Sequence, residues 1–171
     1  MRILYVILDG AADRPIPQLK YITTLEAAHT PNLDYFARKS VGGLVYTVGK
    51  GIAPESDVAV YSMLGYKVRE GYAGRGVIEA LGSGLEFSDG NLALRGNFAT
   101  VEEDMTIVDR RVGRTLTSEE AKSLAEAINN KIELSDRRKS VTVKATVGHR
   151  CVVVFRAEDM RLSDNIKNTD P

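Results

Sequence analysis

The chain opens with apolar residues that do not alternate with polar ones. Ile3–Leu8 form a continuous run, which is typical of a strand buried on both faces, as in a parallel sheet. Leu44–Val48 predict a second strand of this kind. Between them, Thr30 as an N-cap and Pro31 at the first helical position predict a crossover helix. We therefore predict a strand, a helix and a second strand of one parallel sheet.

The pattern changes after Gly65. Three glycines fall within residues 66–76, and shorter segments with other periodicities follow. We place a domain junction near residue 66 and predict an α+β module beyond it. The expected elements are a short helix at Val77–Leu81, antiparallel strands at Leu92–Val101 and Thr106–Asp109, a helix at Ser118–Asn130, and a hairpin of Val141–Val147 with Cys151–Arg156 that turns through Gly148.

The helix at Ser118–Asn130 has the clearest start. Thr117 or Ser118 is a suitable N-cap, and acidic residues occupy the first turn, where they complement the helix dipole. Apolar residues at helical spacing predict the face that packs on a core. These residues are Ala121, Leu124, Ala125 and Ile128.

The charge balance argues against two classes of partner. The chain has 23 cationic and 23 anionic residues, so no global charge favours nucleic acid or an anionic membrane surface. Its single cysteine, Cys151, lies in an apolar run and is expected to be a small buried residue. The apolar run at the N-terminus is too short for a signal peptide or a membrane span. We therefore expect a cytoplasmic protein whose binding specificity is local.

Ser56 lies where a loop is predicted to turn into a helix. Pro54 stiffens the approach, and the apolar residues that follow continue as a helix. A hydroxyl at a helix N-terminus faces unpaired backbone N–H groups and the positive end of the dipole, so an anion is favoured there. The alternative is that Ser56 or Asp57 only caps the helix.

Asp9 follows the first predicted strand directly. Ligands of open α/β sheets gather at the carboxyl ends of strands, so this carboxylate is a candidate metal or substrate ligand. The alternative is a turn made by Asp9 and Gly10 without any chemistry. Because Asp9 and Ser56 follow two strands of one predicted sheet, their side chains are expected to converge at its carboxyl edge.

Arginines beside small residues mark the second region. Guanidinium groups bind carboxylate and phosphate through two hydrogen bonds, and neighbouring glycines allow the backbone to approach a ligand closely. A small polyanion is therefore the expected ligand, although each arginine alone could be solvated and paired with a nearby carboxylate. The candidates are Arg75, Arg95, Arg110, Arg111 and Arg114, whereas Arg137, Arg138 and Lys139 form a plainer basic run expected to be a solvated loop.

The two histidines carry a weaker signal. His29 precedes the predicted Thr30 cap and His149 lies at a hairpin turn, so neither has a partner at metal-ligand spacing. His149 with Arg150 could reach an anion, but a lone loop histidine usually has no specific role.

Several short motifs, in order along the whole chain, resemble the archaeal type of cofactor-independent phosphoglycerate mutase, a branch of the alkaline phosphatase superfamily of metalloenzymes. This resemblance implies an inserted substrate-binding domain after the nucleophile helix, which agrees with a junction near residue 66. The motifs are Ile7–Gly10, Thr30–Asp34, Ser56–Ala59, Leu64–Tyr66, Gly74–Gly76, Arg95–Thr100, Asp109–Arg114 and Asp170–Pro171.

The resemblance implies roles at matching positions. Asp9 would be a metal ligand, and Ser56 would be both the nucleophile and a metal contact. The competing hydroxyl, Ser62, lies six residues further along the same helix and is expected to bond back to the backbone of that helix. The arginines named above would hold the carboxylate and phosphate of phosphoglycerate, Arg95 less surely than the others. Two positions depart from the pattern, because Glu55 and Val60 stand where many or some relatives have glycine and histidine.

The implied fold class is α/β: the N-terminal part of an alkaline-phosphatase-like parallel sheet unit, followed by an inserted α+β substrate-binding domain. The domains would be residues 1–65, 66–160 and a return segment at 161–171. The family is longer, and its remaining Asp and His metal ligands lie beyond this chain, so we expect it to be the N-terminal part of an enzyme and incomplete for catalysis alone.

The implied activity is interconversion of 2- and 3-phosphoglycerate through a phosphoserine, a step of glycolysis and gluconeogenesis. Coordination of a serine hydroxyl to a divalent cation lowers its pKa, and manganese, magnesium or zinc would serve, with two ions in the complete enzyme. The partner would be a small-molecule substrate, with no nucleic acid or membrane, and a homo-oligomer is possible. The alternatives are a phosphomonoester hydrolase of the same superfamily and a non-catalytic fragment that acts by binding or self-association.

Overall fold

The computed structural model describes residues 2–167, apart from the side chain of Arg69. Contacts between Cα atoms divide the chain into two compact units, residues 1–46 and residues 47–171. The predicted return segment and the motif Asp170–Pro171 lie partly or wholly outside the described residues. Each unit is described below by itself.

The first unit contains three short helical elements. A 3-10 helix, η1 (Pro17–Leu19), precedes α1 (Thr24–Ala27), which Thr23 and Glu26 start with a reciprocal capping box. The helix α2 (Pro31–Lys39) follows, with Thr30 in the N-cap position and Pro31 as its first residue. This confirms the predicted helix, although the Thr30 hydroxyl bonds to the Asp34 carboxylate, at 3.0 Å, rather than to a backbone N–H.

The two strands predicted in the N-terminal region are not formed. Residues 3–8 and 44–48 have no strand structure, and both segments are exposed for most of their length, as at Leu4 with 88% exposure and Leu44 with 105%. A parallel strand needs neighbouring strands to bond its backbone N–H and C=O groups and to cover its side chains. Neither segment has such a neighbour among the described residues, so the predicted parallel sheet is not formed in this structure and stays a prediction for the longer fold.

The second unit holds most of the regular structure. Its first helices are α3 (Ser56–Met63), α4 (Val68–Gly71) and α5 (Arg75–Gly82). The strands are β1 (Leu92–Asn97), β2 (Thr100–Val101), β3 (Ile107–Asp109), β4 (Lys139–Ala145) and β5 (Arg150–Ala157), with the 3-10 helix η2 (Val112–Arg114) and the helix α6 (Ser118–Lys131) between β3 and β4.

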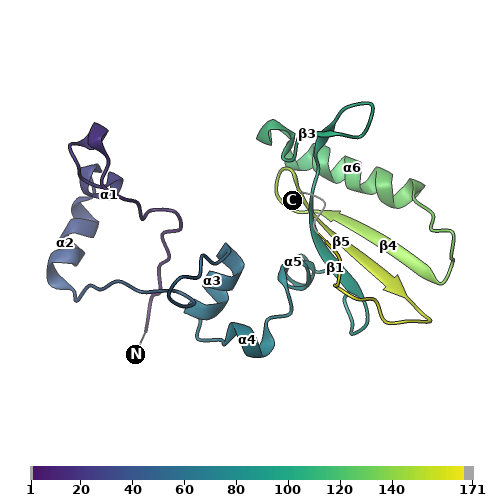
Figure 1. Ribbon diagram of the computed structural model, residues 1–171, viewed down its shortest axis with the longest axis horizontal. Helices are drawn as coiled ribbons and strands as arrows, with labels where there is room; N and C mark the ends of the chain where they lie inside the picture. Colours follow the sequence, from purple (N-terminus) through teal and green to yellow (C-terminus); the bar gives the residue numbers. More distant parts are fainter. Residues whose placement is uncertain (1, 168–171) are drawn as a thin grey trace. The chain divides into compact units, whose positions relative to one another are not determined.

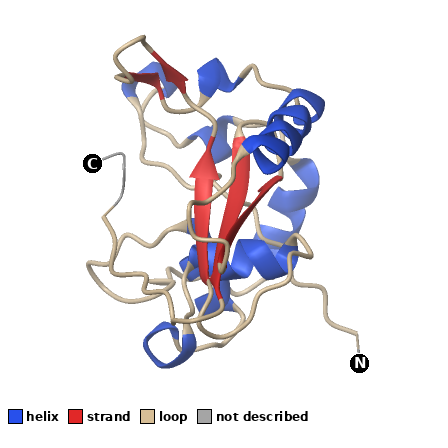
Figure 2. Ribbon diagram, turned by 90° about the vertical axis from the view of Figure 1, so that its right-hand side faces the viewer, coloured by secondary structure: helices blue, strands red, loops and turns tan. Residues whose placement is uncertain are grey.

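An antiparallel sheet of three strands organises this unit, with β5 between β1 and β4. Figure 2 shows the three strands lying side by side. The hairpin of β4 and β5 was predicted and turns through Gly148, which has a positive φ of 54°. The predicted pairing of Leu92–Val101 with Thr106–Asp109 is only partly confirmed, because β1 pairs with β5 while the short β2 pairs with β3.

The middle strand β5 is covered on both faces. Val152 and Val154 are fully buried and pack with Ala80 of α5, whereas Cys151 and Val153 point to the other face and pack with α6. Successive residues of a strand face opposite sides, so one apolar run serves two helices. The result is a layered unit, with α5 on one face of the sheet and α6 on the other (Figure 1).

The helix α6 begins as predicted. Thr117 is the N-cap, and its side chain forms a reciprocal capping box with Glu120. Ala121 and Ala125 are buried against the sheet, as the periodicity predicted, but Leu124 is 44% exposed and lies at the edge of that contact. A narrow stripe of alanines therefore lets the helix approach the sheet closely.

The structure confirms a mixed α/β fold class and an α+β arrangement after residue 66. The compact units divide at residues 46 and 47, so α3 with Ser56 falls in the same unit as the antiparallel sheet. The domain boundaries of the longer fold, including the junction near residue 66, stay predictions.

No helix in the described part of the chain is long and apolar enough to span a membrane.

We predict that Gly76→Ala destabilises the second unit strongly. A Cβ at residue 76 would lie 2.0 Å from the Ala93 carbonyl oxygen, so α5 could no longer approach β1. Overpacking of this kind costs about 1–3 kcal/mol or more, and the contacted atoms are backbone that cannot swing away. Urea denaturation measures the loss in the free energy of unfolding.

The matched control is Gly82→Ala in the same helix. A Cβ at residue 82 would meet no atom within 4 Å, so stability should change by at most about 0.5 kcal/mol, because alanine favours helix. Equal losses for the two variants would contradict the close approach of α5 and β1.

Candidate functional site

Ser56 is the first residue of α3, at the end of an exposed loop. Glu55 is the N-cap residue, with an extended backbone and no side-chain capping bond. The expectation that Ser56 or Asp57 caps this helix was therefore wrong. The Ser56 side chain is exposed, beside backbone N–H groups of the first turn that have no helical partner. The hydroxyl is thus presented to solvent where an anion is stabilised.

Asp57, next to Ser56, is held in place by two neighbours. Its side chain is 13% exposed, and its Oδ2 accepts a short hydrogen bond from the Tyr72 hydroxyl. Burial raises the pKa of the Tyr72 phenol, and the bond to Asp57 raises it further, so the phenol stays a proton donor. The other oxygen, Oδ1, is buried without a hydrogen bond and lies 3.9 Å from the Arg75 guanidinium.

Arg75 is bound by carboxylates on both sides. Its Nε donates to Glu79 Oε1 at 2.7 Å, one turn along α5, and its Nη1 donates to Glu55 Oε2 at 3.2 Å. The hydrogen bond to Glu79 is the largest cause of the raised pKa of Arg75. Glu55 is 71% exposed, so its pair with Arg75 is screened by water and weak.

Arg95 of β1 lies beside this pair with an unsatisfied donor. Its Nε is 3.9 Å from the same Glu79 oxygen, too far for a hydrogen bond, and is buried without a partner among the described residues. Burial lowers the pKa of Arg95 most, and the positive charge of Arg75 lowers it further. A buried guanidinium N–H without an acceptor is costly, so this position favours an anionic ligand.

A strained turn presents Arg111 and Arg114. The Asp109 carboxylate accepts hydrogen bonds from the backbone N–H groups of Arg111, at 2.7 Å, and Gly113, at 2.8 Å. Three successive residues have positive φ, including the β-branched Val112 at 51°. The two non-glycine residues, Val112 and Arg114, cost about 1–3 kcal/mol each in this conformation and persist where the surroundings hold them, often at functional sites.

His149 is acted on by the positive charges of several arginines. Burial lowers its pKa first, and the charges of Arg150, Arg111, Arg114 and Arg95 lower it further. The histidine lies at the turn between β4 and β5, and its carbonyl accepts from Phe98 N at 2.8 Å. Four guanidinium groups thus act on one imidazole at this end of the sheet.

The predicted arginines are therefore partly assembled. Arg95 belongs both to the pair with Arg75 and to the group around His149, which also contains Arg111 and Arg114. Arg110 is exposed in the same turn, but it is not among the charges that act on His149.

Ser62, the competing hydroxyl of α3, is occupied. Its Oγ is part-buried and donates to the carbonyl of Thr47 at 2.5 Å. The expected bond back along its own helix was wrong, because the preceding loop provides the acceptor. Ser62 therefore fastens the loop to α3 and leaves Ser56 as the exposed hydroxyl.

Asp9 lies in the first unit and is exposed, in a turn that follows the unpaired segment 3–8. Ser56 lies in the second unit, so their predicted convergence at a sheet edge stays a prediction. A carboxylate and a hydroxyl are suitable oxygen ligands for magnesium or manganese, but such ions take about six. Within residues 2–167, no group of three or more His, Cys, Asp or Glu side chains could hold a metal.

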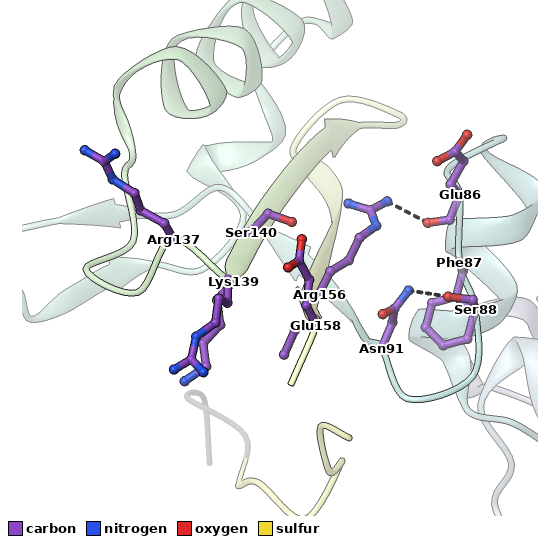
Figure 3. Close-up of a pocket in the computed structure, with 11 residues that line it drawn as sticks. Glu86, Phe87, Ser88, Asn91, Arg137, Lys139, Ser140, Arg156 and Glu158 are labelled. Carbon is purple, nitrogen blue, oxygen red and sulfur yellow. Dashed lines mark hydrogen bonds between the residues drawn. The ribbon is translucent and has the colours of Figure 1, made fainter. Parts of the chain in front are cut away.

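A hollow of about 440 Å³ lies at the opposite end of β5 from Arg150. Arg156 and Glu158 line it, together with the basic run Arg137–Lys139 and the loop at Glu86 (Figure 3). The basic run was expected to be a solvated loop, and Arg137 and Arg138 are exposed as such a loop would be. The expectation was wrong for Lys139, which is half-buried and is the first residue of β4.

Three cations of this hollow, Arg138, Lys139 and Arg156, already have partners. The Arg156 guanidinium donates to the Glu86 carbonyl and to the Thr142 hydroxyl, and Asp136 pairs with both Arg138 and Lys139. The carboxylates of Glu86 and Glu158 lower the positive charge further. The group around Arg95 and His149 is therefore the better candidate for anion binding.

The sequence model of the 2,3-bisphosphoglycerate-independent phosphoglycerate mutase family matches residues 37–171. The chain belongs to this family. The mutase of that name from Aeropyrum pernix is 51% identical over 172 residues, which cover 100% of this chain and 40% of the relative. The corresponding protein of Methanopyrus kandleri is 43% identical, over 99% of this chain and 40% of the relative. The chain thus spans about two fifths of the length of these relatives.

Solved structures agree with this assignment. The cofactor-independent phosphoglycerate mutase from Thermoplasma acidophilum is 41% identical, with a TM-score of 0.51 over 96% of this chain and 42% of that one. The PH0037 protein from Pyrococcus horikoshii is 35% identical, with a TM-score of 0.68 over 87% of this chain and 35% of that one. The resemblance that the motifs indicated is therefore confirmed.

Sequence reasoning missed several residues of this candidate site. Glu79 follows Arg75 by four residues, a helical spacing that could have suggested their pair. The hydrogen bond between Tyr72 and Asp57 joins residues that are 15 positions apart, so no local sequence pattern predicted it. His149 and Arg150 gave only a weak signal, because a lone loop histidine usually has no specific role. The arginines that act on His149 come from distant segments.

We predict that removing either of two arginines raises the pKa of His149. Arg150→Gln and Arg111→Gln each delete a positive charge that disfavours the imidazolium, so the pKa should move part of the way back to its ordinary value. Burial, the larger cause, is unchanged, so the recovery is incomplete. NMR titration of the histidine ring protons measures the shift.

Arg137→Gln is the control, because this arginine lies at the opposite end of β5. An equal rise in this variant would indicate a general charge effect and would contradict the local cluster.

Proposed function

We propose that this chain supplies the nucleophile and the substrate-binding arginines of an enzyme that interconverts 2- and 3-phosphoglycerate. One observation carries the proposal: the buried Arg95 Nε has no hydrogen-bond acceptor among the described residues, and the charges of Arg95 and three further arginines together lower the pKa of His149. A compact substrate with a carboxylate and a phosphate would satisfy such a group of donors. The family relationship supports this choice of anion.

The proposed chemistry transfers one phosphoryl group twice. The Ser56 oxygen attacks phosphorus of 2-phosphoglycerate, the bond from phosphorus to the substrate O2 breaks, and the serine proton ends on the O2 of glycerate. Glycerate then re-orients, and its 3-hydroxyl takes the phosphoryl group while the proton returns to Ser56. Backbone N–H groups at the start of α3 stabilise the charge on phosphate, and the arginines retain glycerate between the two steps.

A divalent metal belongs to the proposal as well. Asp9 and Ser56 would provide two oxygen ligands, and a bound manganese, magnesium or zinc ion would lower the pKa of the serine hydroxyl. Their donor atoms fit such an ion, whereas the described residues alone do not complete its ligand set. Further ligands would come from parts of the fold that the longer relatives contain.

The exposed apolar segments also support the proposal that further parts of the fold complete this one. Residues 3–8 and 44–48 carry aliphatic and aromatic side chains with little cover. Contiguous apolar surface of this kind marks a contact site or an aggregation hazard. We propose that these segments are strands of the family's sheet and pair with further strands of the fold.

Arg114→Ala should weaken binding of 2-phosphoglycerate to this chain. Loss of one charge-assisted, two-pronged contact costs about 1.5–3 kcal/mol, which corresponds to about 10- to 150-fold in the dissociation constant. Isothermal titration calorimetry on the chain measures this directly. Arg38→Ala, which removes an exposed guanidinium from α2 in the other unit, should leave the affinity unchanged. Equal affinities of the wild type and Arg114→Ala would remove the arginine cluster from the substrate site.

In an enzyme that is as long as its relatives, Ser56 should carry the phosphoryl group. The metal-loaded enzyme is mixed with phosphoglycerate and quenched in acid, and the phosphopeptide is mapped by mass spectrometry. We expect phosphate on Ser56, none after Ser56→Ala, and little in either Asp9→Ala or a chelated sample. Ser62→Ala is the matched control and should still form the phosphoserine.

Two results would contradict this mechanism. One is phosphate on Ser62, and the other is continued interconversion by Ser56→Ala. Release of inorganic phosphate in place of the isomer would instead identify a phosphomonoester hydrolase, which uses the same nucleophile but loses the intermediate to water.

A further inference from the structure

Glu79 contacts two arginines through one oxygen atom. Its Oε1 accepts from Arg75 Nε at 2.7 Å and lies 3.9 Å from Arg95 Nε. All three side chains are between 22% and 28% exposed, so water screens their charges only partly. Without this carboxylate, two guanidinium groups would face each other across a short distance and repel.

The elements that carry these residues are held together firmly. Arg75 and Glu79 lie one turn apart on α5, and Gly76 between them allows the helix to touch the backbone of β1, which carries Arg95. The side chains are therefore anchored on a helix and a strand, and the position of Glu79 follows from packing.

Glu55 also pairs with Arg75, but in a different way. Its carboxylate reaches Nη1 at 3.2 Å from the loop before α3, and its side chain is 71% exposed. An incoming anion can displace a solvated carboxylate of this kind at low cost. Glu79 binds Nε instead, so displacement of Glu55 frees Nη1, which then has, among the described carboxylates, only Asp57 Oδ1 near it, at 3.9 Å.

We propose that Glu79 is a positioning residue that holds Arg75 and Arg95 side by side as one two-arginine binding site for the substrate's phosphate or carboxylate. Glu55 occupies part of this site in the absence of the substrate, and the substrate's anionic group displaces it. The inference rests on the proposed function, because it assigns a role within the same arginine group. Glu79 itself does not contact the substrate; it opposes the repulsion between the two guanidinium groups and fixes their direction. Arg95 Nε has no hydrogen-bond acceptor among the described residues and lies 3.9 Å from Glu79 Oε1, so the carboxylate acts on it through charge.

Two isosteric variants separate this role from simple electrostatics. Removal of any carboxylate beside the arginines makes the site more positive, which by itself strengthens anion binding. Glu55→Gln should follow this rule and bind 2-phosphoglycerate about two- to fivefold more tightly. Glu79→Gln should do the opposite and weaken binding about tenfold, because the arginines lose their alignment. Calorimetry on the chain gives both constants, and urea denaturation confirms that both variants remain folded.

A second measurement needs no ligand. NMR signals of the arginine Nε–Hε groups report the surroundings of Arg75 and Arg95 directly. In Glu79→Gln both signals should shift and the Arg75 proton should exchange faster with water, whereas Glu55→Gln should leave the Nε–Hε of Arg75 nearly unchanged. This readout tests the alignment even in a variant that does not bind.

The outcomes distinguish the inference from the function on which it rests. Tighter binding by Glu79→Gln, or unchanged arginine signals in it, would overturn the positioning role while leaving the substrate site intact. Failure of the wild-type chain to bind 2-phosphoglycerate would count against the proposed function, and the NMR comparison would still decide whether Glu79 aligns the two arginines.

Discussion

The burial of β5 on both faces is the constraint on which the ordered part of this chain depends. Val152 and Val154 face α5, and Cys151 faces α6, so one short apolar run fixes two helices against one sheet. This arrangement also brings the candidate site together. The start of β5 carries Arg150 after His149, β1 beside it carries Arg95, and α5 carries Arg75. Packing in the core thus decides which charges meet at the surface.

The site concentrates positive charge and controls it with acidic residues of different kinds. Glu79 bridges Arg75 and Arg95 from the inside, Asp109 shapes the turn that presents Arg111, and Glu55 covers Arg75 from solvent. Of these carboxylates, only the exposed one, Glu55, can be displaced at low cost when another anion binds. The site still holds a donor, Arg95 Nε, that has no acceptor within residues 2–167.

The first unit shows the opposite situation, in which local structure forms without a sheet. Its helices begin at favourable residues, the Thr23 cap of α1 and Pro31 at the first position of α2, whereas the segments 3–8 and 44–48 have no regular structure and are largely exposed. A helix satisfies its own backbone hydrogen bonds, but a strand depends entirely on its neighbours. The same difference explains why α2 agrees with the sequence prediction while the parallel strands do not.

Local sequence was sufficient for the features whose physics is local. Several features could be predicted from the sequence because each depends on neighbours within a few residues. They are the capping residue Thr117, the alanine face of α6, the hairpin through Gly148 and the family motifs. Tertiary structure decided the rest. It paired β1 with β5, gave Ser62 its acceptor at Thr47, and placed His149 among arginines from three segments. These contacts join residues far apart in the chain, and their geometry follows from how helices and strands pack, which no short pattern of residues encodes.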